Sequence, residues 1–321
     1  MNLRTILAAV AALTMLARCG TTEPAATDAP TTGAASITVT DSRGKQVTLP
    51  GPASRVVTLE WGQTEDAVTL GVQPVGVADP TGYGHWVTAA KLTGSPVDVG
   101  LRTEPSLESV AKADPDLILG VENSIPADAV AQMEQIAPVV LLRSSDAARP
   151  LGQMRDNVTT TGKLLGKTAE ADRVLADLDA KIAQGKAAIA AAKPGPFALA
   201  YINVTGNKAD FRMHGPRSQP GALAAELGLT NAVTDAGDAS WGLSSLDVEA
   251  LTKLPADTAF WYWTTDTVAD PVTTTLAKNA VWQRLPFVTA KRVEPIAGGV
   301  RLYGGPASMM QLVDAYVAAV R

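Results

Sequence analysis

The sequence repeats a short acidic segment, and this repeat limits the choice of fold more than any other feature. In the first copy, Glu108 is followed by Asp116 and an apolar run; in the second, Glu249 is followed by Asp257 and another apolar run. In both copies the Glu lies eight positions before the Asp that precedes the predicted strand. A short helix that leads into a strand, once in each half of the chain, indicates two lobes of similar build.

The stretch that precedes the first copy alternates short β-rich runs with a helical segment. Runs 37–40 and 46–49 flank a turn that contains glycine and predict a hairpin. Run 55–59 predicts a buried strand, segment 65–70 a helix, and run 75–78 the next strand. Strand, helix and strand in succession predict a parallel α/β sheet.

A long helical segment separates the two copies of the repeat. Apolar residues recur in it at helical spacing, Gly166 is placed to break or kink it, and a Pro-Gly-Pro sequence at 194–196 ends it. A second sheet is expected from residue 197 onward. The predicted fold is therefore α/β, with two Rossmann-like lobes at 37–149 and 193–321 that are joined by the long helix at 150–192.

The N-terminus has the layout of a secretory signal. Residues 1–18 carry Arg4 and an apolar stretch of about 12 residues, which is shorter than the roughly 20 that span a bilayer. The lone Cys19 ends a segment that resembles a bacterial lipobox, with Arg18 as a departure from the small residue usual there. We predict a lipidated Cys19 followed by a flexible tether over 19–36, which is rich in Thr, Ala and Pro. A plain signal peptide with an incidental Cys is the alternative.

Composition excludes several classes of function. A net charge of -5 provides no basic field for a nucleic-acid partner. With only 2 His and 1 Cys, the usual zinc ligand sets and an internal disulfide cannot form. No Gly-x-Ser-x-Gly motif supports an exported hydrolase that would use His85 or His214, so no catalytic residue is predicted. A surface adhesin or scaffold is the other alternative.

The chain resembles the helical-backbone class (class III) of bacterial periplasmic binding proteins, and within it the iron-siderophore group nearest the ferric-hydroxamate binders. The resemblance covers nearly all of 37–321. Its matching pieces keep the family order and lie at 56–61, 65, 70–79, 83, 86–87, 98–108, 214–218, 240–242, 281–288 and 303–304.

This resemblance implies a ligand cleft between the lobes. Carried over by position, Trp86 and Trp241 would be aromatic walls, Arg102 the donor to iron-bound oxygens, and Tyr303 a further wall and hydrogen-bond donor. Trp61 follows a strand at its carboxyl end, which fits either core packing or a ligand wall. Alternatively, Arg102 is a solvated surface residue or forms a structural ion pair with Glu104.

Two departures from the family bear on the identity of the ligand. Arg301 stands where hydroxamate binders usually have Trp, and Ser124 stands where a Tyr is expected. Arg217 adds a further positive charge at the predicted rim. The site is therefore expected to be less aromatic and more cationic, which shifts weight toward a mixed or carboxylate siderophore. With the resemblance to hydroxamate binders, the expected ligand is a ferric siderophore of the hydroxamate or the mixed hydroxamate and citrate type. Haem and cobalamin are alternative ligands.

The resemblance also implies a partner. Glu108 and Glu249 match the two exposed acids, one on each lobe, that meet arginines of an ABC importer permease; helix-start residues are the alternative. The expected protein is a monomer anchored by lipid to the outer face of the cytoplasmic membrane. It is not an enzyme and has no cofactor, because the siderophore supplies the oxygen ligands of the iron.

The remaining aromatic and histidine residues are expected to be structural. Trp261 and Trp263 share one face of a strand and predict core packing, as does Trp282. His85 and His214 are too few and too far apart to form a metal site, and we predict neither as a ligand.

Overall fold

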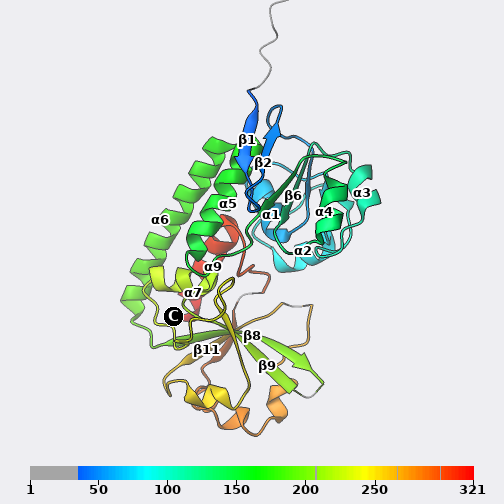
Figure 1. Ribbon diagram of the computed structural model, residues 1–321. Helices are drawn as coiled ribbons and strands as arrows, with labels where there is room; N and C mark the ends of the chain where they lie inside the picture. Colours follow the sequence, from blue (N-terminus) through cyan, green and yellow to red (C-terminus); the bar gives the residue numbers. More distant parts are fainter. Residues whose placement is uncertain (1–34, 207, 266, 297) are drawn as a thin grey trace, which may run out of the picture. The chain divides into compact units, whose positions relative to one another are not determined.

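Two five-stranded sheets organise the part of the chain that the computed structural model describes, which is residues 35–206, 208–265, 267–296 and 298–321 (Figure 1). The predicted signal peptide and Cys19 lie outside the described residues. The described residues from 35 onward belong to one compact unit. We call the first sheet with its helices the N-terminal lobe, and the second sheet with its helices the C-terminal lobe.

The sheet of the N-terminal lobe is entirely parallel, as the alternation of strand and helix predicts. Its strands, in the order β5-β4-β3-β6-β7, are Val97–Asp98, Gly76–Val77, Val56–Thr58, Leu117–Val121 and Val139–Leu142. Every residue of β3, β6 and β7 is buried, which explains their unbroken apolar runs. The accompanying helices are α1 (Trp61–Thr69), α2 (Pro80–Trp86), α3 (Leu107–Lys112) and α4 (Ala127–Met133).

The predicted hairpin is present at the start of the described chain. Strands β1 (Ile37–Thr40) and β2 (Gln46–Leu49) pair antiparallel. Val39, Val47 and Leu49 are buried in the same core cluster as residues of β6 and β7, so the hairpin packs on the N-terminal lobe.

The sheet of the C-terminal lobe is mixed, unlike its counterpart. Its strands, in the order β10-β9-β8-β11-β12, are Leu243–Leu246, Lys208–His214, Phe197–Thr205, Ala259–Trp263 and Val293–Ile296. Strands β8, β11 and β12 are parallel, whereas β9 and β10 run antiparallel to their neighbours. The difference has a simple cause: β8 and β9 follow each other directly, which an antiparallel pair permits and a parallel pair does not.

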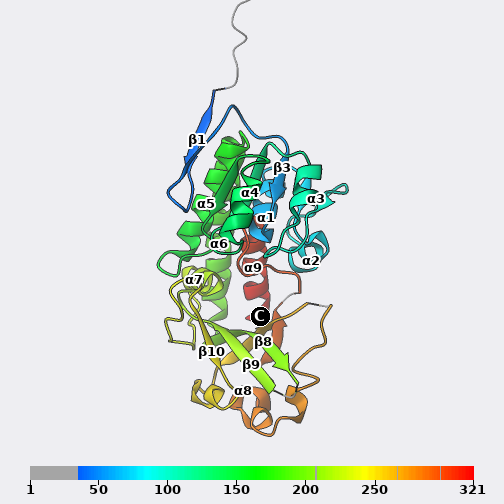
Figure 2. The same ribbon diagram turned by 45° about the vertical axis from the view of Figure 1, so that its right-hand side comes forward.

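Two helices, and not one, fill the segment between the sheets. Helix α5 covers Pro150–Leu164 and α6 covers Thr168–Ala192. Gly166 separates them with a φ of +66°, a conformation that glycine adopts at no steric cost. Helix α6 lies alongside α5 and the C-terminal helix α9 (Pro306–Ala319), as Figures 1 and 2 show. None of the helices in the described residues is both long and apolar enough to cross a membrane.

The repeated acidic segments occupy matching places in the two sheets. Helix α3 leads into β6 and the 3₁₀ turn η1 (Ala250–Lys253) leads into β11, and each of these strands lies beside the central strand of its sheet. The second copy therefore begins with a 3₁₀ turn where a helix was expected. The other elements of this lobe are α7 (Gln219–Glu226), α8 (Pro286–Thr289), η2 (Leu276–Lys278) and η3 (Trp282–Arg284).

Candidate ligand-binding cleft

A cleft of about 680 Å³ lies between the two lobes. The N-terminal lobe contributes side chains from α1, α2 and the loop after β5, and the C-terminal lobe contributes side chains from β8 to β11 and from the loop before α9. The lining residues are Trp61, Trp86, Arg102, Tyr201, Arg212, His214, Asp238, Trp241, Leu243, Ser245, Trp263, Arg301 and Tyr303. Aromatic rings and guanidinium groups dominate this wall.

Arg102 lies over the ring of Trp61 and is paired with Glu60. Its guanidinium carbon is 4.0 Å from the centroid of the Trp61 ring, a cation–π distance. Its Nη1 donates to both Oε1 and Oε2 of Glu60 at 2.8 Å. Glu60 is fixed in turn, because it is the N-cap of α1 and its Oε1 accepts from the Trp61 backbone N–H at 2.8 Å. The partner of Arg102 is therefore Glu60, and not the exposed Glu104.

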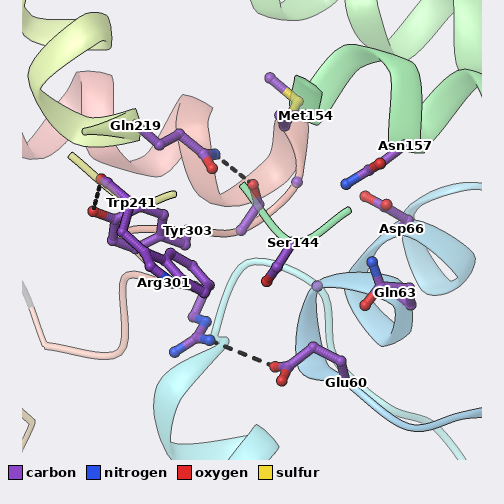
Figure 3. A pocket seen from close by; sticks show the side chains of 13 residues that line it. Glu60, Gln63, Asp66, Ser144, Met154, Asn157, Gln219, Trp241, Arg301 and Tyr303 are labelled. Atoms are coloured by element: carbon purple, nitrogen blue, oxygen red, sulfur yellow. Dashed lines mark hydrogen bonds and ion pairs between the residues drawn. The ribbon is translucent and has the colours of Figure 1, made fainter. Parts of the chain in front are cut away.

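Arg301 approaches the same carboxylate from the C-terminal lobe. Its Nη2 is 3.5 Å from Glu60 Oε1, the contact drawn in Figure 3, and its guanidinium carbon is 5.2 Å from the centroid of Trp61. Only 16% of the Arg301 side chain is exposed, and its Nε is buried without a hydrogen-bond partner among the described residues. Burial lowers the pKa of Arg301, since it disfavours the charged form, and the nearby Glu60 opposes that shift. Two arginines thus share one carboxylate.

An aromatic cluster forms a second part of the cleft. The ring of Trp86 lies 4.5 Å from Trp263 and 6.4 Å from Tyr201, centroid to centroid, so rings from both lobes meet. The predicted core packing of Trp263 is only part of its role. Trp263 is half-buried and packs against the core cluster that contains Trp261, but it stands at the end of β11 and also lines the cleft. Trp261 is buried against Phe197, as expected.

Trp241 and Tyr303 form a third part of the wall. Their rings meet edge to face at 4.9 Å, and the Tyr303 hydroxyl donates to the Trp241 backbone oxygen at 2.9 Å (Figure 3). This bond fixes the loop that carries Trp241. Asp238 in the same loop accepts from three backbone N–H groups; burial favours a higher pKa for its carboxyl, but these bonds hold the pKa below its usual value.

His214 is buried behind these rings. Its Nδ1 is 3.5 Å from the Tyr303 hydroxyl, and its Nε2 has no hydrogen-bond partner among the described residues. Burial, with a smaller effect of Arg212, lowers the pKa of His214 to about 3. The imidazole is therefore neutral at physiological pH. No group of three or more His, Cys, Asp or Glu in the described part of the chain is placed to hold a metal ion.

A smaller polar chamber of about 280 Å³ adjoins the cleft, shares Arg102, Trp241 and Arg301 with it, and is also lined by Glu60. Ser124, which stands where the family resemblance leads one to expect Tyr, lines this chamber. Its hydroxyl donates to the Val121 backbone oxygen at 2.9 Å. The small serine leaves this chamber open beside the two arginines.

The two lobes are tied together next to the cleft. Glu65 of α1 accepts hydrogen bonds from the backbone N–H and the hydroxyl of Ser308 in α9, both at 2.7 Å. Burial raises the pKa of Glu65, although these bonds oppose the shift. Thr88 N–H donates to the Gly299 oxygen at 3.0 Å, and a Cβ on Gly299 would lie 2.4 Å from the Thr88 methyl carbon. Only glycine permits this close approach.

A pocket of about 30 Å³, drawn in Figure 3, lies beside these contacts. It has room for about one or two water molecules. Gln63 Oε1 and Asp66 Oδ1 are buried there without a hydrogen-bond partner among the described residues. Burial raises the pKa of Asp66 well above its ordinary value, and the adjacent Glu65 adds to this shift.

The structure brings most of the sequence-predicted ligand residues to one place. Trp61, Trp86, Arg102, Trp241, Arg301 and Tyr303 all line the cleft. Arg217 does not: its Nε donates to the Ala147 backbone oxygen at 2.9 Å, next to the start of α7. Glu108 and Glu249 are exposed on α3 and just before η1, one on each lobe.

Several cleft residues were not predicted from the sequence. Tyr201, Arg212 and His214 lie on β8 and β9, where the antiparallel pairing carries their side chains to the cleft. Glu60, which lines the adjoining chamber, lies within a segment that carries the family resemblance, but no ligand role was predicted for it. A carboxylate that directly follows a buried strand was the only available signal.

Several known proteins are similar to this chain in sequence or structure. Residues 56–296 match the model of the periplasmic binding protein family. The chain is 30% identical to the iron(3+)-hydroxamate-binding protein FhuD of Escherichia coli K12, over 81% of this chain and 84% of that protein. It is also 30% identical to the Fe(3+)-citrate-binding protein YfmC of Bacillus subtilis 168, over 68% and 66%. The crystal structure of the siderophore-binding protein FhuD of Vibrio cholerae with Fe3+-Desferal superposes with a TM-score of 0.72 at 27% identity, covering 83% of this chain and 97% of that one.

Two α/β lobes, a helical connection and an interlobe cleft together define a bilobal ligand-binding protein of the helical-backbone class. The chain belongs to the periplasmic binding protein family. The fold class expected from the sequence is confirmed.

Proposed function

We propose that this protein is the extracytoplasmic substrate-binding component of an ABC importer and that it binds a ferric siderophore in the interlobe cleft. The observation that carries the proposal is the lining of the cleft, where the rings of Trp61, Trp86, Trp241 and Tyr303 surround two arginines. A ferric siderophore has an apolar outer surface and a rim of metal-bound oxygens. Rings pack on the former and guanidinium groups donate to the latter.

The ligand class follows from the cationic part of the cleft. Arg301 provides a second guanidinium where hydroxamate binders usually have an aromatic ring, and Ser124 leaves an open polar chamber beside it. Both features favour a ligand with carboxylate oxygens. Relatives are named for hydroxamate and for citrate complexes, so we propose a hydroxamate or a mixed hydroxamate and citrate siderophore, and the cationic features favour the mixed type.

Binding of this kind needs no cofactor and no catalytic group. The siderophore provides the oxygen ligands of the iron, which is cargo here, and the protein provides the walls and donors. The relatives found are named as binding proteins, and we propose that this chain, too, is not an enzyme.

Delivery to the membrane is the second part of the proposal. Glu108 and Glu249 are exposed before equivalent strands of the two sheets, so each lobe presents one acid to arginines of a permease. A monomer would be held near that permease by a lipid on Cys19, and two relatives are named as lipoproteins.

Mass spectrometry of the mature N-terminus tests the lipid anchor. An unmodified terminus at another residue would remove the anchor from the proposal.

The ligand is tested by quenching of tryptophan fluorescence with ferrichrome, ferric citrate, haem and cobalamin. Four tryptophans line the cleft, so iron bound there should quench their emission. We expect saturable, stoichiometric quenching by a ferric complex. Binding of haem or cobalamin alone would show that the ligand is one of these and not a ferric siderophore. Turnover of an ester by the purified protein would favour a hydrolase.

A further inference from the structure

Glu60 lines the chamber beside the cleft, an unusual position for an acid next to a site that we propose to bind anionic or oxygen-rimmed complexes. It contacts Arg102 of its own lobe and Arg301 of the other lobe. Both guanidinium groups also lie over the same ring, Trp61. One carboxylate therefore gathers the two cations that face the ligand.

The charges of this group do not balance. Arg102 and Arg301 carry two positive charges and Glu60 one negative charge, so one positive charge remains uncompensated. Arg212 and Asp238, which also line the cleft, carry opposite charges and offset each other. The Arg102, Arg301 and Glu60 group therefore decides the net charge that a ligand meets.

The position of Glu60 is fixed, and its arginines keep donors to spare. The Oε1 of Glu60 also accepts from the Trp61 N–H at the start of α1, and only 13% of its side chain is exposed. Only Nη1 of Arg102 is hydrogen-bonded within the described residues, and both bonds go to Glu60. The Nε of Arg301 is buried, so only its Nη groups can reach a ligand. A carboxylate held in this way orients the guanidinium groups and leaves N–H donors for the ligand.

We infer that Glu60 is the residue that sets the charge selectivity of the cleft. This inference rests on the proposed function and adds to it a specificity residue outside the predicted ligand set. Glu60 keeps the two arginines side by side but cancels half of their charge. It thereby restrains the binding of highly anionic ferric complexes and lets neutral complexes compete.

The variant Glu60→Gln tests the inference, because its amide oxygen still accepts from the Trp61 N–H while the negative charge is lost. We expect ferric citrate to bind about tenfold more tightly than to wild type, as one unit charge is removed within a few Å of the ligand. Ferrichrome, a neutral trihydroxamate, should change by less than about threefold. Salt should weaken ferric citrate binding more steeply in the variant.

Two further variants control the experiment. Glu104→Gln removes an exposed acid from the same loop as Arg102, so it changes the protein's net charge equally and should leave both affinities unaltered. Glu60→Asp keeps the charge on a shorter side chain, so the ratio of the two affinities should stay within about threefold of wild type. Thermal melting confirms that each variant is folded.

Several results would overturn the inference. Equal changes for ferric citrate and ferrichrome in Glu60→Gln would show a role in folding or positioning alone. The same gain in Glu104→Gln would show a general field effect. Failure of wild type to bind any ferric complex would instead overturn the proposed function, and the inference with it.

Discussion

Glu65 in α1 caps the N-terminus of α9 by accepting two hydrogen bonds from Ser308, across 243 positions of sequence. Glu65 is fully buried, so this contact is inaccessible to water. It joins the two lobes at the base of the cleft. The first prediction concerns its energy.

Glu65→Ala should lower the free energy of unfolding by about 2 to 4 kcal/mol, because it leaves two buried donors unsatisfied. Glu65→Gln should cost less, since it retains an acceptor oxygen and resembles the protonated form that burial favours. Because the pKa of Glu65 is raised on folding, its contribution to the free energy of unfolding is lost as pH rises through that pKa. Over that range the stability of Glu65→Gln should therefore rise relative to that of wild type.

Urea unfolding measures the free energy of unfolding of each variant and its pH dependence. Ser308→Ala combined with Glu65→Ala should cost less than the sum of the single changes, and strict additivity would contradict the contact.

Arg102→Ala should weaken ferric-siderophore binding at least tenfold without unfolding the protein. A charge-assisted hydrogen bond contributes about 1.5 to 3 kcal/mol, which is about one to two decades of affinity. Arg217→Ala is the matched control, because this arginine lies outside the cleft and should leave affinity unchanged. Fluorescence titration distinguishes the two; a loss in Arg217→Ala that equals the loss in Arg102→Ala would mean that the cleft is not the binding site.

Arg301→Trp should favour neutral trihydroxamates over anionic citrate-type complexes. The change replaces a cation near Trp61 by ring surface, so it removes Coulomb attraction and adds apolar contact. The measurement is the ratio of the dissociation constants for ferrichrome and ferric citrate. An unchanged ratio would show that Arg301 does not face the ligand.

Glu108→Ala and Glu249→Ala should leave affinity nearly unchanged but impair iron uptake by cells, and the double variant should be worse than either. Each acid is exposed and neither lines the cleft. Glu104→Ala, which removes another exposed acid of the N-terminal lobe, is the control and should take up iron normally. Normal uptake by the double variant would leave these acids as helix-start residues only.

His214 should make the protein less stable in acid. Its pKa falls from the ordinary 6.5 to about 3 on folding, so between these values the unfolded chain binds more protons than the folded one. The contribution of the neutral imidazole to the free energy of unfolding is complete above about pH 6.5. It is lost as pH falls toward 3, by up to about 1.4 kcal/mol per pH unit. His214→Gln should flatten this dependence in unfolding experiments between pH 4 and 7, and His85→Gln, at an exposed position, should not. Parallel curves for wild type and His214→Gln would contradict the burial of a neutral imidazole.

The fold was largely predictable because its signals are local. Apolar runs such as 117–119 are buried on both faces of a sheet, and the hairpin at 37–49 has its turn chemistry in the sequence. The antiparallel strand β9 was missed because it is rich in polar residues and exposed along half its length. The break at Gly166 was allowed for, and its φ of +66° explains it.

The candidate site was less predictable because it depends on where elements end and on distant contacts. Trp261 and Trp263 have the same strand periodicity, and only the end of β11 separates core from cleft. Glu60 meets Arg301 across the lobes, which no local pattern indicates. Arg217 looked like a rim residue in sequence, yet its guanidinium turns to the Ala147 carbonyl.

The contact between Trp86 and Trp263 joins rings of both lobes. Each ring restricts the rotamers of the other, so part of their rotamer freedom is lost when the chain folds. A ligand that enters such a pre-ordered wall incurs little further loss of conformational entropy. Association should accordingly be limited by diffusion and by release of water from the cleft, with most differences in affinity between cargoes expressed in their rates of dissociation.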